Sequence, residues 1–413
     1  MEVAVRSLCL KGLPGPIEFA SPLEFVADDV KRVLVGWPEV ACDELSSREP
    51  LMTVSGTPDA VLLNHRYMDT PRIEPSPTSA ICSLIVELMA DFVDGDDSLG
   101  NLHAGAVEFA DRLVVFPATN RAGKSTLVGA LASHGHRVFA DDLLPIDLVR
   151  LEAIASGCLP RLRLPLPESA PDTLKIHVAA NALLNDGYYT YLPAADAQLA
   201  VAHGDRSKLG ALVLLDRREG DITPSIEAIE PDEALLRVLL QDTKNGLGTW
   251  TLDRYLALVG TIGIYRLVYS RVDDAVTCLQ ANFASWPEQE QRALQIARAA
   301  EPDEDADDDD FAFAPKPGQA LIARAPHVVA RVVGQAAFLV DLDSNDIHHL
   351  NQVGLALWNL IAKPLDVETI VDIFQEAFPD TPEAQLRADL AAAVDRFLKS
   401  GLAVLEPPLA VSA

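Results

Sequence analysis

Residues 117–126 read Pro117-Ala118-Thr119-Asn120-Arg121-Ala122-Gly123-Lys124-Ser125-Thr126. A strand-like apolar run at residues 113–116 precedes this stretch, and a helix-like apolar run at residues 127–132 follows it. Strand, loop and helix in that order form the context that a phosphate-binding loop requires. The sequence therefore predicts an α/β core that binds a nucleotide through residues 118–126, with an ordinary strand–turn–helix as the alternative.

Three residues of the predicted loop suit triphosphate binding. Gly123 lets the backbone approach a phosphate, and the helix that follows presents unpaired N–H groups and a positive dipole end. Lys124 adds a charge for the outer phosphates, and the hydroxyl of Ser125 can hold Mg²⁺. Ala118 stands where the full pattern has glycine, and a positive φ there would cost an alanine about 1–2 kcal/mol.

An apolar run at residues 138–140 ends in two carboxylates, Asp141 and Asp142. The carboxyl ends of parallel strands line the ligand crevice of an open α/β sheet, so both are expected beside the loop. Phosphoryl transfer needs one carboxylate to hold Mg²⁺ and another to accept the proton of the attacking hydroxyl. A helix N-cap is the alternative role. His103, further upstream, could orient one aspartate, although a lone histidine is more often structural.

The ordered motifs resemble the HPr serine kinase/phosphorylase family over roughly residues 95–275. They are His103-Ala104-Gly105, Gly123-Lys124-Ser125, and the Asp141-Asp142 pair after Gly135-His136-Arg137-Val138. The resemblance implies an ATP- and Mg²⁺-dependent kinase. In that family's arrangement Asp141 is the general base, hydrogen-bonded by His103, while Asp142 and Ser125 serve the Mg²⁺ ion.

The chain departs from that family in residues 155–164, where no Glu-x-Arg-Gly signature is found. This departure argues against phosphorylase activity and against HPr as the substrate. Arg161 and Arg163 in this segment could contact a phosphate or an acidic peptide, or simply flank an edge strand. Lys175 and Arg206 are further cationic candidates that the sequence does not rank.

The C-terminal hundred residues predict strands at 321–333, 337–342 and 347–350, with a turn at 334–335. Three helices are expected after them: one capped by Asn351, one over 367–378 opened by Asp366, and one over 383–399 that stops at Gly401. Strands followed by three short helices suggest a small winged-helix-like module.

Residues 315–406 resemble the PqqD family of peptide chaperones in the same register. The motifs are His349-Leu350-Asn351-Gln352-Val353-Gly354, Leu357-Trp358-Asn359-Leu360, and the later Asp389, Val394, Phe397-Leu398 and Gly401-Leu402. The resemblance implies that this module binds the leader segment of a ribosomally made precursor peptide. The leader would add as a strand to a sheet edge and pack against a helix.

Length and composition predict several domains. We expect an N-terminal α+β lobe at 1–94, the kinase-like domain at 95–285, a helical and acidic linker at 286–314, and the PqqD-like domain at 315–413. The formal charge is −28, of which residues 301–310 contribute −8, so −20 remains elsewhere. Such a charge argues against a nucleic-acid partner. The acidic run predicts a solvated linker.

Five scattered cysteines without a Cys-x-x-Cys motif predict reduced thiols and no disulfide or zinc site. Without a signal peptide or an apolar run of membrane-spanning length, we expect a cytoplasmic protein and no membrane partner. An apolar run at 81–89 predicts a short buried helix, and residues 250–269 predict a long apolar helix supporting the core.

Together the two halves predict a kinase that phosphorylates a serine or threonine hydroxyl of a precursor peptide, held through its leader. Related kinases act on lasso-peptide precursors, which the resemblance suggests as a substrate class. A catalytically degenerate leader-binding scaffold is one alternative, and nucleotide-dependent activation of a peptide carboxylate is another. Other peptide-maturation enzymes and further copies of this chain remain open as partners.

Overall fold

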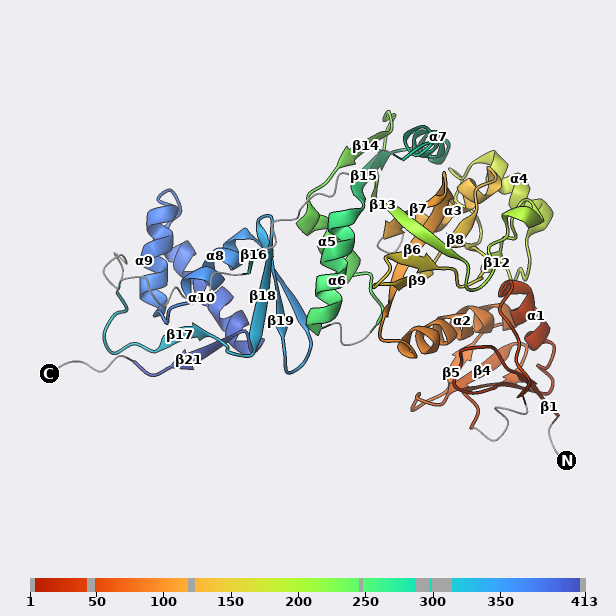
Figure 1. Cartoon of the computed structure of the whole chain (residues 1–413), viewed down its shortest axis with the longest axis horizontal. Coiled ribbons are helices and arrows are strands. Elements are labelled where there is room, and N and C mark those ends of the chain that lie inside the picture. Colours follow the sequence, from red (N-terminus) through yellow and green to blue (C-terminus); the bar gives the residue numbers. More distant parts are fainter. Residues whose placement is uncertain are drawn as a thin grey trace. The chain divides into compact units, whose positions relative to one another are not determined.

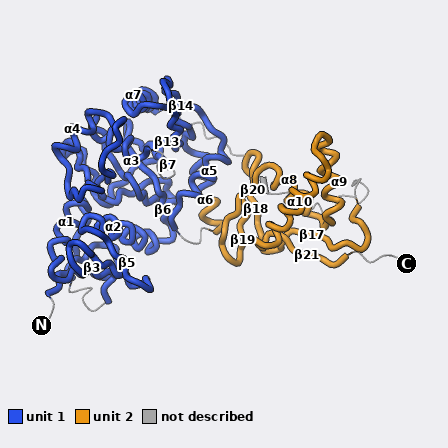
Figure 2. The backbone as a smooth tube through the Cα atoms, turned by 180° about the vertical axis from the view of Figure 1, so that it is seen from behind, with its two compact units in different colours: residues 1–245, 254–292 blue, residues 246–253, 293–413 orange. Residues whose placement is uncertain are grey.

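The computed structural model describes residues 4–42, 49–117, 123–244, 248–286, 297–298 and 314–408. It divides into two compact units (Figure 2): unit 1 comprises residues 1–245 and 254–292, and unit 2 comprises residues 246–253 and 293–413. Much of the expected linker at 286–314, including its acidic run, lies outside the described residues, as do loop residues 118–122. No described helix is long and apolar enough to cross a membrane.

Unit 1 begins with a five-stranded sheet in the order β1-β2-β3-β4-β5. Its strands are β1 (Val5–Leu8), β2 (Ile17–Ala20), β3 (Met52–Thr57), β4 (Ala60–His65) and β5 (Arg72–Glu74). Two helices accompany it, α1 (Val26–Val33) and α2 (Pro77–Asp94). The short apolar helix expected at 81–89 lies inside α2, which packs on β4 and also on β6 and β9 of the next sheet.

The second sheet of unit 1 has the order β10-β9-β6-β7-β13-β15-β14, with β8 also paired to β6. Its strands are β6 (Leu99–Phe109), β7 (Arg112–Pro117), β8 (Val138–Ala140), β9 (Leu143–Asp147), β10 (Glu152–Ile154), β13 (Arg206–Arg217), β14 (Ser225–Ala228) and β15 (Gly263–Tyr269). Strands β7, β13 and β15 run parallel, and β6 is antiparallel to β7, β8 and β9. Residues 113–116 of β7 are fully buried, which explains their unbroken apolar run.

Several helices and a separate two-stranded ribbon follow in unit 1, and two of the helices, α3 (Lys124–Ser133) and α7 (Val272–Asn282), pack on this sheet (Figure 1). The other helices are α4 (Asp172–Asn181), α5 (Pro231–Leu239) and α6 (Gly248–Thr261); the ribbon is β11 (Arg161–Arg163) with β12 (Tyr189–Tyr191). Apolar side chains of α3 and α7 share one core with β7, β13 and β15. The inner face of the ribbon, at Leu162, packs against α3 and α4.

Two sequence expectations are corrected in unit 1. The long helix expected over residues 250–269 ends at Thr261, and Gly263–Tyr269 forms the buried parallel strand β15. The expectation that all cysteines are reduced is also wrong, because Cys9 and Cys42 form a disulfide. Backbone hydrogen bonds from Lys11 to Pro38 and from Val40 to Cys9 bring the two segments together. Cys82, Cys158 and Cys278 are free thiols.

Unit 2 holds a sheet in the order β16-β18-β19-β20 and a second pair, β17 with β21. The strands are β16 (Ala297–Arg298), β17 (Leu321–Arg324), β18 (Val328–Val333), β19 (Ala336–Asp341), β20 (Ile347–Leu350) and β21 (Ala403–Glu406). The helices are α8 (Gln352–Leu360), α9 (Val367–Ala377) and α10 (Glu383–Lys399). The three predicted helices are confirmed, whereas the single strand expected at 321–333 is two strands with different partners.

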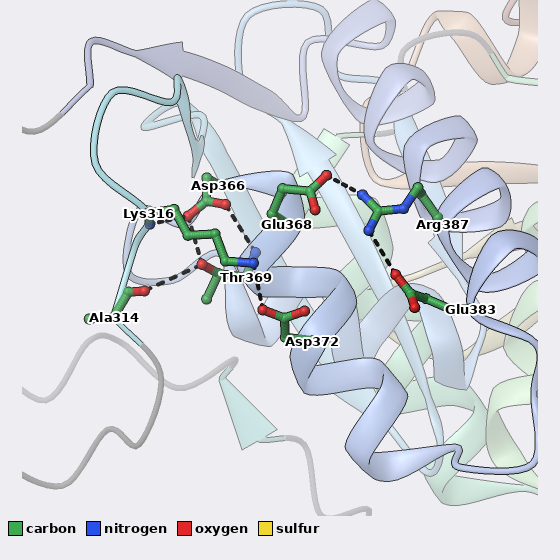
Figure 3. Close-up of polar contacts among 8 residues, drawn as sticks. All are labelled: Ala314, Lys316, Asp366, Glu368, Thr369, Asp372, Glu383 and Arg387. Atoms are coloured by element: carbon green, nitrogen blue, oxygen red, sulfur yellow. Dashed lines mark hydrogen bonds and ion pairs between the residues drawn. The ribbon is translucent and has the colours of Figure 1, made fainter.

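The buried carboxylate of Asp366 links Lys316, which precedes β17, to the start of α9 (Figure 3). Asp366, the N-cap of α9, is fully buried and accepts hydrogen bonds from the backbone N–H groups of Lys316 (2.6 Å) and Thr369 (3.0 Å) and from the Thr369 hydroxyl (2.7 Å). The side chain of Lys316 pairs with Asp372 at 2.6 Å. Residues that precede the first strand therefore belong to the folded domain.

Candidate active site

Helix α3 begins directly after the predicted phosphate loop. Strand β7 ends at Pro117, and Gly123 is the residue before the first turn of α3, with φ +88°. A residue with a side chain is strained at that φ, and a Cβ there would also lie 3.2 Å from the Tyr269 hydroxyl. No side chain caps this N-terminus in the described residues, and its first turn holds no acidic residue. Lys124 is buried, whereas Ser125 and Thr126 are half-buried.

Strands β8 and β9 place the two aspartates beside Lys124. Asp141 and Asp142 connect these strands, which both pair with β6, and the N–H of Ala104 in β6 donates to the carbonyl of Asp142 at 3.0 Å. His103 pairs with Leu143 across the ladder. The β6 strand therefore brings the predicted histidine and the predicted aspartates to one place.

Three cationic or potentially cationic side chains surround Asp142. Its Oδ1 lies 3.0 Å from Nε2 of His103 and 3.7 Å from Nζ of Lys124. Its Oδ2 accepts a hydrogen bond of 2.8 Å from the guanidinium of Arg161 in β11. The predicted contact between His103 and Asp141 is thus wrong, since the histidine faces Asp142. Asp141 instead accepts the backbone N–H of Arg161 at 3.1 Å.

The environments of the two aspartates shift their pKa values in opposite directions. Burial raises the pKa of Asp141, and the attraction of Lys124 only partly opposes this effect. Burial also favours a higher pKa for Asp142, but the hydrogen bond from His103 and the charges of Arg161 and Lys124 outweigh it and hold that pKa well below its usual range. Adjacent carboxylates with separated pKa values can divide the work of base and metal ligand.

Two buried atoms at this place have no hydrogen-bond partner among the described residues, Nζ of Lys124 and Oδ1 of Asp141. The 3.7 Å approach of Lys124 to Asp142 is an ion pair and too long for a hydrogen bond. Burial lowers the pKa of Lys124, although its two aspartate neighbours oppose this shift. Buried polar atoms without a hydrogen-bond partner are rare in folded proteins. Nζ of Lys124 therefore suits a phosphate oxygen of a ligand, and Oδ1 of Asp141 suits a cation. The residues present therefore fit ATP and Mg²⁺.

Gln241, which sequence reasoning did not identify, orients His103 from the other side. Its Oε1 lies 3.1 Å from Nδ1 of His103, and its Nε2 donates to the carbonyl of Leu240 at 3.3 Å, so the amide oxygen faces the ring. The backbone N–H of His103 donates to the Gln241 carbonyl at 2.7 Å. Lys244 secures the same segment by donating to the carbonyls of Asp96 and Leu99, each at 3.1 Å.

A small cavity of about 30 Å³ opens beside the aspartates. Asp141, Asp142 and Arg161 line its polar side, and apolar residues of α2 line the other. Two of the other cationic candidates, Lys175 and Arg206, are engaged elsewhere. Lys175 donates to the carbonyl of Glu168 at 2.9 Å, and Arg206 pairs with Asp147 at 2.8 Å.

Comparison with known proteins classifies the C-terminal domain. Residues 336–403 match the family described as coenzyme PQQ synthesis protein D (PqqD), inside the region where the sequence predicted that family. This match supports peptide binding and a part in the biosynthesis of ribosomally made peptides. No match was found among the curated proteins. The kinase core, ATP and Mg²⁺, and the roles of residues 118–126 remain predictions.

Proposed function

We propose that this protein is an ATP-dependent kinase that phosphorylates a serine or threonine hydroxyl of a ribosomally synthesised precursor peptide. The observation that carries this proposal is the group of Lys124, Asp141, Asp142 and His103 at the start of α3. A leader-binding PqqD domain in the same chain supports a peptide as the substrate. Tethering the leader would raise the concentration of the acceptor residue at the site.

The side chains divide into phosphate-binding and proton-accepting groups. Bound MgATP would supply the transferable phosphoryl group and a cation that neutralises its charge. Lys124 would hold the outer phosphates, and Ser125 with the ionised Asp142 would hold the cation. Asp141, with its raised pKa, would accept the proton of the peptide hydroxyl. In this transfer the peptide oxygen would form the new bond to phosphorus, the bond to the ADP oxygen would break, and Asp141 would accept the proton.

The free edge of the unit 2 sheet suits leader capture. Strand β16 pairs with β18 at one edge, whereas β20 at the other edge pairs only with β19 among the described strands. An extended leader can add to such an edge through main-chain hydrogen bonds. Helix α8 follows β20 and packs on β19 and β20, so apolar leader side chains would have a helix beside them.

Intact-mass spectrometry tests the proposal. A precursor peptide encoded beside this gene, incubated with the protein, ATP and Mg²⁺, should gain about 80 Da per phosphate. Asp141→Asn should lower the rate by about 10²- to 10⁴-fold and leave leader binding, measured by fluorescence anisotropy, unchanged. The exposed Asp172→Asn in α4 is the matched control. An unchanged mass with intact leader binding would replace the kinase by a leader-binding scaffold, and full activity of Asp141→Asn would reject the general-base role.

A further inference from the structure

A cavity of about 440 Å³ lies between the N-terminal part of α2 and the β11–β12 ribbon. The residues that line it and bear on its chemistry are Glu74, Ser79, Arg163, Tyr188 and Tyr189. This volume is ample for one amino-acid side chain. The cavity is separate from the small one beside Asp141 and Asp142, and it has no role in the function proposed above.

Glu74 and Ser79 have hydrogen-bond partners within the protein, whereas the guanidinium of Arg163 has none among the described residues. The carboxylate of Glu74 accepts the Ser83 hydroxyl at 2.5 Å and pairs with Arg72 at 2.6 Å. The Ser79 hydroxyl donates to Asp186 at 3.2 Å. Arg163 is exposed and, within the described part of the chain, has neither an ion-pair partner nor a hydrogen-bond acceptor for its guanidinium. The cavity therefore offers one guanidinium for a ligand from outside.

The Tyr189 ring connects this guanidinium to the candidate active site. The Arg163 guanidinium lies 5.9 Å from the centre of that ring, and the Arg161 guanidinium lies 5.1 Å from it. Arg161 in turn donates to Asp142 at 2.8 Å. Contact with an aromatic face restrains a guanidinium without using its hydrogen-bond donors. Arg163 is thus held in place while its donors stay available.

The spacing along β11 sets where a bound group would lie. Arg161 and Arg163 are two residues apart on one face of the strand, which corresponds to roughly 6.6 Å. An extended peptide advances by the same distance over two residues. A substrate that runs along β11 with its hydroxyl at Asp141 and Asp142 would therefore bring a group two residues away to Arg163.

We propose that this cavity binds a carboxylate of the peptide substrate, two residues from the hydroxyl that receives the phosphate. The proposal rests on the kinase function above. A guanidinium pairs with a carboxylate through two parallel hydrogen bonds, and a carboxylate is the group of this geometry that an unphosphorylated peptide carries. The carboxylate can be an aspartate or glutamate side chain or the C-terminal carboxylate of the peptide.

Short synthetic peptides test this proposal on the full chain with MgATP. The first pair is acetyl-Ala-Ala-Ser-Ala-Asp-Ala-amide and the same peptide with Asn in place of Asp. The second pair is acetyl-Ala-Ala-Ser-Ala-Ala with a free C-terminal carboxylate and its amide. The third pair carries Asp or Asn two residues before Ser. At least one carboxylate peptide should have a kcat/KM about tenfold above its neutral partner, as expected for a charged hydrogen bond. The pair that differs identifies the source and side of the carboxylate.

Variants then locate the effect. Arg163→Gln should remove the preference while keeping the KM for ATP, and Arg163→Glu should favour a peptide with Lys at the same position. The exposed Arg218→Gln is the matched control and should keep the preference. Equal use of all charged and neutral pairs would overturn the proposal. A raised KM for ATP in Arg163→Gln would also overturn it, because the arginine would then serve the nucleotide.

Peptide binding without ATP separates this proposal from the kinase itself. Fluorescence anisotropy with labelled peptides should show the same preference and the same loss in Arg163→Gln. If the preference is seen in binding but neither these peptides nor the leader-bearing precursor gains phosphate, the carboxylate site stands and the kinase fails. If phosphate is transferred without any preference, the kinase stands and the carboxylate site fails. If no binding preference is found and the leader-bearing precursor gains no phosphate either, both fail.

Discussion

The N-terminus of α3 in unit 1 and those of α8 and α9 in unit 2 are completed in different ways. Asn351 and Asp366 each accept the N–H three residues ahead, so local side chains close α8 and α9. No described side chain closes α3, and the polar groups beside it are oriented by residues far away in the chain, such as Gln241, 138 positions from His103. A closed N-terminus stabilises a fold, whereas an open one keeps its N–H groups for a ligand.

The largest effect is expected when the buried charge of Lys124 at the N-terminus of α3 is removed. Lys124→Met keeps the length of the side chain but loses its charge, so phosphate transfer should fall by at least about 100-fold. Filter binding of labelled ATP should weaken as well, while leader binding should not change. Lys175→Met, at an exposed lysine of α4, is the matched control. Unchanged ATP binding in Lys124→Met would show that α3 is not the nucleotide site.

The second test removes the side chain of Asp366, which caps the N-terminus of α9. Asp366→Ala leaves buried N–H groups of Lys316 and Thr369 without an acceptor (Figure 3). The C-terminal domain should lose about 2 kcal/mol of stability, roughly a 30-fold change in its unfolding equilibrium. Hydrogen exchange of the α9 amides measures this loss, and the exposed Asp389→Ala is the control. Equal protection in both variants would contradict the role of Asp366.

The same carboxylate predicts a pH dependence. Burial favours a raised pKa for Asp366, but hydrogen bonds from Thr369 and from the Lys316 N–H outweigh burial and lower it below its ordinary value of 3.8. A lowered folded-state pKa gives stability that is fully present above the unfolded-state value and is lost as the pH falls through the folded-state value. The difference between wild type and Asp366→Ala should therefore be constant near pH 7 and shrink below pH 4. A difference that grew on acidification would reject this sign.

The third test removes the hydrogen bond by which Gln241 orients His103 in the candidate active site. Gln241→Met has a similar shape but cannot accept a hydrogen bond from His103, so kcat should fall by about tenfold, as for other residues that orient a functional histidine. Gln241→Glu keeps an acceptor oxygen and should restore most of the rate. The KM for ATP should stay unchanged in both variants. A purely structural role would give the same loss in both.

The smallest effect is expected at the exposed N-cap of α8. Asn351→Ala removes one hydrogen bond, to the N–H of Gly354, and should cost about 1 kcal/mol. Asn351→Asp keeps the acceptor and should retain the stability in thermal melts. Comparable losses in the two variants would mean that the amide of Asn351 has another task.

Local signals explain why the three helices of the C-terminal domain could be predicted. Asn351, Asp366 and Gly401 mark helix ends through contacts within a few residues, and those ends are where the structure has them. The failure at residues 250–269 has a physical cause as well. A buried parallel strand and a buried helix are both continuous apolar runs, and periodicity does not separate them.

The candidate site was only partly accessible to such reasoning. Motif order predicted that His103, Lys124 and the two aspartates meet, and the structure brings them together. Which aspartate the histidine faces depends on the register of β6 with β9, which no spacing reveals. Gln241 and the Cys9–Cys42 disulfide are contacts between distant segments, and single residues of these types carry no signal in the sequence.

The pairing of β17 with β21 joins the first and last strands of the region from residue 314 to residue 408, with Leu321 opposite Glu406. Both ends of this region therefore leave from the same side of one short ladder. A domain whose ends meet can be inserted into a loop of another protein or circularly permuted without breaking its core. This geometry suits the PqqD domain to fusion with other enzymes through either of its ends.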